Sequence, residues 1–131
     1  MTDTTAPVAK AWTLNHWEVT GSALGIIITC RGHDKAGTAG AATQTFQDLA
    51  AGRAGRFSII ADLREMTGYE SEARVAWQQA FYRLRTRIDC LVIVGARSAL
   101  IRMGAAAVGA VAGIPVRFVT TWEEVASALR G

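Results

Sequence analysis

The stretch FSIIADLREMTGYESEARVAWQQAFYRLRTR, residues Phe57 to Arg87, decides the fold. It begins with a mostly apolar run, Phe57–Ala61, which is typical of a buried strand. A polar turn, residues 67–70, is expected to follow, and then a helix. The apolar residues of that helix recur at gaps of four and three, which places them on one face: Ala73, Trp77, Phe81, Leu84 and Ile88. Ligands of open α/β sheets bind outside the carboxyl ends of strands, where such turns lie.

The patterns on either side of this stretch predict strands that alternate with helices. Before it, we expect a tail at residues 1–11 and two strands, Trp12–Val19 and Ala23–Cys30, which a turn at 20–22 joins as an antiparallel hairpin. A helix over Lys35–Ala51 is expected next, with Asp34 as its cap. After it, we expect a strand, Asp89–Val94, and a helix, Ala99–Val111, which Ser98 or Arg97 opens and Gly113 ends. A short strand, Val116–Val119, and a C-terminal helix follow, and a capping box of Thr121 and Glu124 opens that helix.

The resulting order, β-β-α-β-α-β-α-β-α, predicts an α/β fold with a mostly parallel sheet and an N-terminal antiparallel hairpin. The sequence contains no repeat and no interdomain linker, so residues 12–131 are expected to form one domain. Half of the residues are hydrophobic and 19% are charged, as in a folded globular protein.

The charge pattern excludes few classes of function, but it argues against a nucleic-acid-binding protein. The formal net charge is +3, from 14 basic and 11 acidic residues, and the basic residues are scattered along the chain. The polar N-terminus lacks the apolar core of a signal peptide, and Arg102 interrupts the longest weakly polar run, Ala99–Val116. We therefore expect a cytoplasmic protein without a membrane span. Cys30 and Cys90 lie in or beside strands and are expected to be free, buried thiols.

Four segments carry a family resemblance: Ile60–Leu63, the following turn into a helix that bears Trp77, Val92–Gly95 and Trp122–Val125. They resemble the SpoIIAA-like proteins of the STAS superfamily, over roughly Trp12–Leu129. The resemblance implies a STAS-type layer sandwich. These proteins are also similar in fold to CRAL-TRIO lipid-transfer domains, which implies a small hydrophobic or lipid ligand by analogy.

In the better-known STAS regulators, a serine that starts the helix after the third strand is phosphorylated by a partner kinase. Ser71 falls near that position, so the resemblance implies a phosphosite there. This sequence departs from the pattern, since Glu70 stands where those regulators usually carry Asp. Glu70 and Glu72 would also repel a phosphate on Ser71. The alternative for Ser71 is a helix cap or a solvated surface residue.

Six residues are candidates for ligand binding. Arg64, Tyr69 and Arg74 could form a polar rim whose arginines hold a carboxylate or a phosphate, or they could be ordinary surface residues. Trp77 and Met103 could line a cavity together with Tyr69, or pack in the core. Arg102 lies on an otherwise apolar helix, so it must reach solvent, pair with a carboxylate or meet a ligand.

Three functions follow as hypotheses. The first is a non-enzymatic regulatory or binding module that acts through protein contacts, with the helix Ser71–Arg87 as its contact face and exposed apolar side chains on it or its neighbour. The second is a carrier of a lipid or of a small hydrophobic or anionic ligand, with a pocket under the Arg64–Tyr69 turn that follows the central strand. The third is an enzyme with this turn as its active site, which would require a titratable group with a strongly shifted pKa in a cleft. We expect no catalytic residue set, metal or cofactor, because no such cluster is visible in the sequence. A homodimer is an open alternative that no residue demands.

Overall fold

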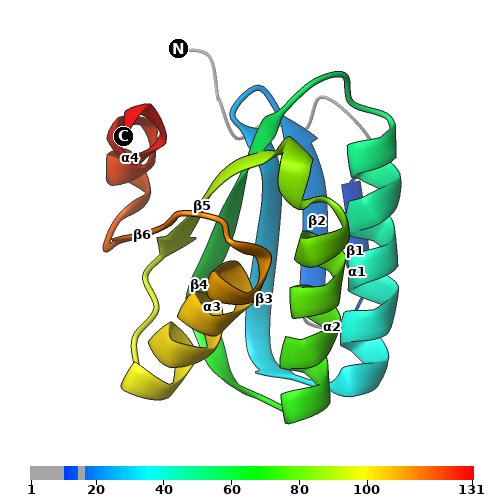
Figure 1. Cartoon of the computed structure of the whole chain (residues 1–131). Coiled ribbons are helices and arrows are strands. Elements are labelled where there is room, and N and C mark those ends of the chain that lie inside the picture. The colour runs from blue at the N-terminus through cyan, green and yellow to red at the C-terminus, as the bar shows by residue number, and fades with distance from the viewer. Residues whose placement is uncertain (1–10, 15–16) are drawn as a thin grey trace.

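A six-stranded sheet in the order β1-β2-β3-β4-β5-β6 forms the centre of the molecule (Figure 1). The computed structural model describes residues 11–14 and 17–131, and side chains from Trp17 onward. The strands are β1 (Ala11–Leu14), β2 (Trp17–Ser22), β3 (Gly25–Asp34), β4 (Phe57–Tyr69), β5 (Ile88–Val94) and β6 (Val116–Val119). β2 pairs antiparallel with both β1 and β3, and the pairs from β3 to β6 are parallel. The expected α/β architecture is confirmed, but the expected single strand Trp12–Val19 is wrong, because this segment contributes to two paired strands, β1 and β2.

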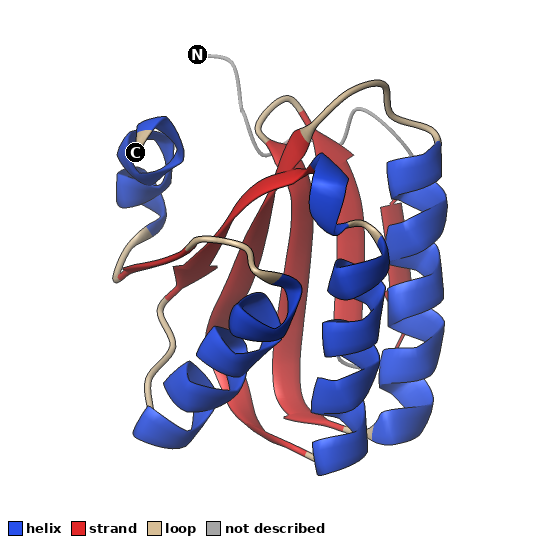
Figure 2. Cartoon of the chain, viewed as in Figure 1, coloured by secondary structure: helices blue, strands red, loops and turns tan. Residues whose placement is uncertain are grey.

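Three helices cover one face of the sheet: α1 (Ala36–Ala51), α2 (Ser71–Arg83) and α3 (Ala99–Ala112) (Figure 2). Each connects one parallel strand to the next strand in the sheet, and right-handed crossovers in a constant direction place all three on the same side. The short 3₁₀ helix η1 (Arg85–Arg87) precedes β5, and the 3₁₀ helix η2 (Trp122–Glu124) precedes α4 (Val125–Arg130). Among the described residues, no helix combines the length and hydrophobicity that a membrane span requires.

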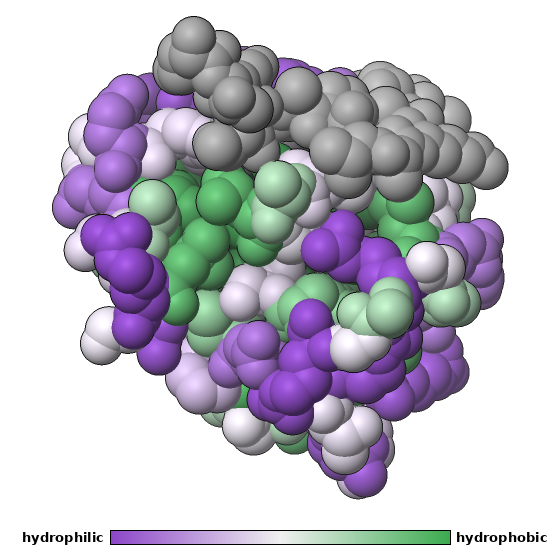
Figure 3. All heavy atoms as spheres, turned by 90° about the horizontal axis from the view of Figure 1, so that it is seen from above, coloured by the Kyte–Doolittle hydropathy of each residue, from purple (hydrophilic) through white to green (hydrophobic). Residues whose placement is uncertain are grey.

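The main core lies between these three helices and the sheet. Its centre is a group of aromatic rings around Phe46, whose centroid lies 5.2 Å from that of Phe81 and 6.0 Å from that of Trp77. A smaller apolar cluster on the opposite face packs under α4 through Val125. Seen from above, one larger hydrophobic area interrupts a mostly hydrophilic surface (Figure 3).

The expected helix signals at the C-terminal half are confirmed. Ser98 Oγ accepts the backbone N–H of Ile101 at 3.1 Å, so Ser98 caps α3. Gly113 ends α3 with φ of 71°, in the left-handed region that favours glycine. Thr121 and Glu124 form the expected capping box. These signals involve residues close in sequence, which is why the sequence alone reveals them.

Several expected boundaries are wrong. Thr20–Ser22 belongs to β2 and not to a turn, because it pairs with the start of β3. The expected polar turn at residues 67–70 is largely strand, since β4 continues to Tyr69 beside β3. The central helix ends at Arg83 and not at Arg87. Asp34 does not cap α1: it is buried at the end of β3, and the backbone N–H of Ala36 donates instead to Glu70 Oε1 at 2.8 Å.

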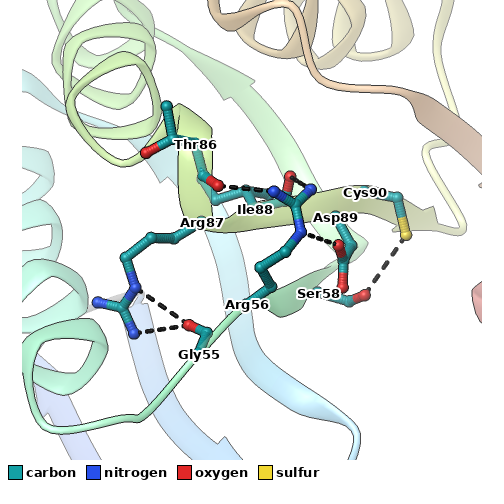
Figure 4. A network of polar contacts seen from close by, with 8 residues as sticks. All are labelled: Gly55, Arg56, Ser58, Thr86, Arg87, Ile88, Asp89 and Cys90. Carbon is teal, nitrogen blue, oxygen red and sulfur yellow. Dashed lines mark hydrogen bonds and ion pairs between the residues drawn. The ribbon is translucent and has the colours of Figure 1, made fainter.

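Arg56 and Arg87, which directly precede β4 and β5, form hydrogen bonds that link the segments before these two strands (Figure 4). Arg87 donates to the carbonyl oxygens of three residues around the end of α1, at 2.6–3.1 Å: Ala50, Arg53 and Gly55. Arg56 pairs with the Asp89 carboxylate at 2.6 Å. The end of α1 therefore obtains side-chain donors for carbonyl groups that a helix terminus leaves without partners. These arginines are structural, on the evidence of their contacts.

Candidate functional site

A cavity of about 70 Å³ lies between α2, α3 and the helical face of the sheet. Most of its wall is hydrophobic and comes from strands and helices alike: Ile28, Ala61, Leu63, Leu91 and Ile93, with Phe81, Ile101 and Val108. Four half-buried residues of the wall reach the surface and form a rim: Met66, Tyr69, Arg74 and Ala105. An apolar cavity of about 150 Å³ can hold benzene. The enclosed volume here thus fits one end of a small ligand, whose remainder would extend past the rim.

The wall also contains a buried carboxyl group, that of Asp34, which is 2% exposed. Its Oδ1 accepts a hydrogen bond from Trp17 Nε1 at 2.7 Å. Burial raises the pKa of Asp34 to about 6, although the Trp17 N–H and the nearby His33 lower it; Glu70 raises it further. Desolvation therefore outweighs the hydrogen bond, and the ionised carboxylate destabilises the fold near neutral pH.

Trp77 presents a second indole beside the same carboxyl. Its ring centroid lies 4.8 Å from that of Trp17, and its side chain is 6% exposed. Trp77 Nε1 is buried without a hydrogen-bond partner among the described residues. It is nevertheless close enough to Asp34 to lower the pKa of that group slightly. Most buried polar atoms have partners, so an unpaired N–H in a cavity wall calls for an explanation.

Irregularities in β4 bring the rim residues to the cavity side. In the pairing of β3 with β4, the register shifts between Thr29 and Arg31 and again between Gly32 and His33, each time adding a residue to β4. Each extra residue inverts the alternation of side chains along β4. As a result, Met66 and Tyr69 both face the helices, and Tyr69 pairs with Asp34.

Gly104 allows the ring of Tyr69 to lie against α3. A Cβ atom at Gly104 would lie 2.6 Å from both Cζ and the hydroxyl oxygen of Tyr69. The Tyr69 hydroxyl donates to the carbonyl oxygen of Leu100 at 3.2 Å. Tyr69 therefore spans from the end of β4 to α3 and closes one side of the rim.

The structure brings three of the six sequence-predicted ligand candidates to this cavity: Tyr69, Arg74 and Trp77. Tyr69 and Arg74 lie on the rim, and Trp77 lies in the buried wall, where it also belongs to the core as expected. Whether they bind a ligand stays a prediction.

The other three candidates lie elsewhere. Arg64 is on the opposite face of the sheet, where its guanidinium binds the Asp62 carboxylate at 2.7–2.9 Å and lies over the Trp122 ring. The expectation that Met103 lines the cavity is wrong, since its side chain is 68% exposed. Arg102 is also exposed, and it donates to the carbonyl oxygen of Ala96 at 3.1 Å, so it reaches solvent rather than a buried partner.

The remaining expectations concern chemistry rather than ligand binding. Ser71 is exposed at the first position of α2, and its phosphorylation stays a prediction. Cys30 and Cys90 are free and buried, as expected, and burial raises the pKa of the Cys30 thiol. No group of three or more metal-binding side chains occurs in the part of the chain that the structure describes.

Sequence reasoning missed Trp17 and Asp34 as parts of the site. A signal for Asp34 was present, because Ile26, Ile28 and Cys30 alternate along β3, and the same period continues to position 34. Extending that strand by four residues would have placed an acidic side chain on the core-facing side. For Trp17, the sequence contains no indication that its N–H meets a residue 17 positions away.

The strand order and the helices on one face define an α/β fold, and the comparisons with known proteins show that this fold is SpoIIAA-like. No protein-family model and no curated protein sequence matches the chain. Among solved structures, the chain is similar to an uncharacterized protein of the DUF3478 family with a SpoIIAA-like fold, from Shewanella loihica PV-4. The TM-score is 0.67 at 12% identity, over 90% of this chain and 98% of the other. At that identity the likeness establishes the fold, which confirms the SpoIIAA-like resemblance, and leaves function open.

Proposed function

We propose that this protein is a non-enzymatic binding module for a small, mainly hydrophobic ligand. The observation that carries the proposal is the cavity between α2 and α3, whose hydrophobic wall contains the buried Asp34 carboxyl and a Trp77 N–H that has no partner among the described residues. Small-molecule sites are usually concave and mostly apolar, with a few polar groups that orient the ligand. The shifted pKa of Asp34 also meets the requirement stated for an enzyme. The other titratable side chains of the described cavity wall are Tyr69 and Arg74, and the Tyr69 hydroxyl already donates to the carbonyl oxygen of Leu100.

Replacing Ala105 by Leu is expected to abolish ligand binding. Ala105 is on the rim, so the larger side chain would occupy the entrance, whereas Ala107 is half-buried on the same helix but does not line the cavity. The measurement is native mass spectrometry of protein purified from its natural host, followed by the same sample denatured. Wild type and Ala107→Leu should carry a mass that is lost on denaturation, and Ala105→Leu should not. A bare wild-type chain, or an equal bound mass in both variants, would contradict the proposal.

A specific observation also favours the protein-contact hypothesis as a second candidate. The outer side of α3 exposes the large apolar side chains Leu100, Met103 and Val111, and α2 exposes Val75 and Tyr82. Exposed apolar groups of this size on neighbouring helices are typical of protein–protein interfaces when they are contiguous.

If α3 is a contact face, the double replacement Leu100→Glu with Met103→Glu should abolish association while leaving the fold intact. Both side chains are exposed, at 59% and 68%, so charges there remain solvated. Sedimentation velocity of wild type and variant checks for a second copy, and cross-linking in host extract checks for another protein. Identical sedimentation and identical cross-links for the two proteins would argue against a contact role for α3.

A further inference from the structure

Two polar atoms of the cavity wall have hydrogen-bonding capacity left over. One is Trp77 Nε1, a donor that lies buried without a partner among the described residues. The other is Asp34 Oδ2: the Trp17 N–H binds Oδ1, and no hydrogen bond from the described part of the chain reaches the second oxygen. Asp34 and both indoles line the same cavity, and the ring centroids of Trp17 and Trp77 lie 4.8 Å apart. A ligand group seated there would meet a donor and an acceptor together.

The pairing of one donor with one acceptor restricts the chemistry of the ligand. With a pKa of about 6, Asp34 is mainly a carboxylate at neutral pH and accepts hydrogen bonds. An ammonium group could bind the carboxylate, but it has no lone pair for the Trp77 N–H. A ligand carboxylate could accept from Trp77, but it would face the negative charge of Asp34 in a low-dielectric wall. A hydroxyl group donates one hydrogen bond and accepts others, so it satisfies both sides.

We propose that this cavity recognises the hydroxyl group of an aliphatic alcohol, which donates to the Asp34 carboxylate and accepts from the Trp77 N–H. The inference rests on the proposed function, of which it specifies the ligand class. The hydrocarbon chain lies along the hydrophobic wall and leaves the cavity at the rim between Tyr69 and Arg74. The hydroxyl enters first because the two polar atoms lie in the buried wall and the rim is half-buried.

Three probes with the same six-carbon chain test the inference by isothermal titration calorimetry at neutral pH: 1-hexanol, hexyl methyl ether and hexylamine. The alcohol both donates and accepts, the ether only accepts, and the protonated amine only donates. We expect 1-hexanol to bind about tenfold more tightly than either of the others, the effect of about one unmade hydrogen bond. Equal affinities of the alcohol and the ether, or a preference for the amine, would overturn the inference while leaving a hydrophobic binding site in place. If none of the three binds, the proposed function itself fails for ligands of this size.

A variant pair locates the recognition at the indole. Trp77→Phe removes the N–H and keeps an aromatic ring, and it should lower the affinity for 1-hexanol about tenfold. Trp122→Phe is the matched control, because Trp122 lies with Arg64 on the opposite face of the sheet. The affinity of this variant for 1-hexanol should equal that of wild type. Equal 1-hexanol binding by Trp77→Phe and wild type would overturn the inference. The comparison of probes on wild type keeps the test decisive even if Trp77→Phe does not fold.

Discussion

As the pH rises from 3.8 to 7.5, the unfolding free energy of Asp34→Asn is expected to increase by about 3 kcal/mol relative to that of wild type. The pKa of this carboxyl is about 6 in the folded protein and 3.8 in its ordinary state, a difference of roughly two units at 1.36 kcal/mol each. Because the folded pKa is raised, the folded state binds the proton more tightly than the unfolded state. Ionisation of Asp34 therefore opposes folding. Its cost is absent below pH 3.8, grows up to about pH 6 and is complete above it.

Urea unfolding of wild type and Asp34→Asn across this pH range measures the effect. Other titrating groups are the same in both proteins, so their contributions cancel in the difference. The control is Asp48→Asn on the exposed side of α1, where a change within about 0.5 kcal/mol is expected at every pH. Parallel pH profiles for wild type and Asp34→Asn would show that Asp34 is not buried as the structure places it.

The largest loss of stability is expected from Phe46→Ala, at about 3–5 kcal/mol. Phe46 is fully buried, and three aromatic rings have their centroids within 6.3 Å of its own: Phe57, Trp77 and Phe81. Removing the ring leaves a void that these rigid neighbours fill only in part, so both transfer free energy and dispersion contacts are lost.

Chemical denaturation of Phe46→Ala and Phe118→Ala provides the comparison. Phe118 lies on β6 with a side chain that is 44% exposed, so its replacement should cost about 1 kcal/mol or less. A loss below about 1.5 kcal/mol for Phe46→Ala would contradict the assigned core. Because Phe46 also supports the Trp77 ring from the side of α1, the variant should bind a cavity ligand more weakly than wild type.

Sequence reasoning predicted the strands and helices whose signals are local. The apolar run of β4, the stripe of Trp77 and Phe81 and the cap at Ser98 depend on residues a few positions apart, and each was confirmed. It failed where the outcome depends on pairing between distant residues. The extra residues in β4 that bring Tyr69 to the cavity exist only through its register with β3.

The bounds of α3 were predicted to within one residue, but the position of Met103 on it was predicted wrongly, for a different reason. Its sequence combines alanine, glycine and branched apolar residues on all sides, so periodicity does not separate its faces. The buried side is set by small residues, since Gly104 accommodates Tyr69 and Gly109 lies against Val116. This orientation leaves Met103 exposed, although a hydrophobic residue on such a helix is expected in the core.

The most direct test of the cavity as a ligand site is a ¹H–¹⁵N spectrum of the tryptophan indole groups during titration with 1-hexanol. Trp17 and Trp77 line the cavity, whereas Trp122 lies on the other face of the sheet. Our account predicts that the N–H signals of Trp17 and Trp77 shift and saturate, with Trp77 moving most, while the Trp122 signal stays in place. Unchanged Trp17 and Trp77 signals, or a shift of Trp17, Trp77 and Trp122 alike that does not saturate, would contradict a binding site in this cavity.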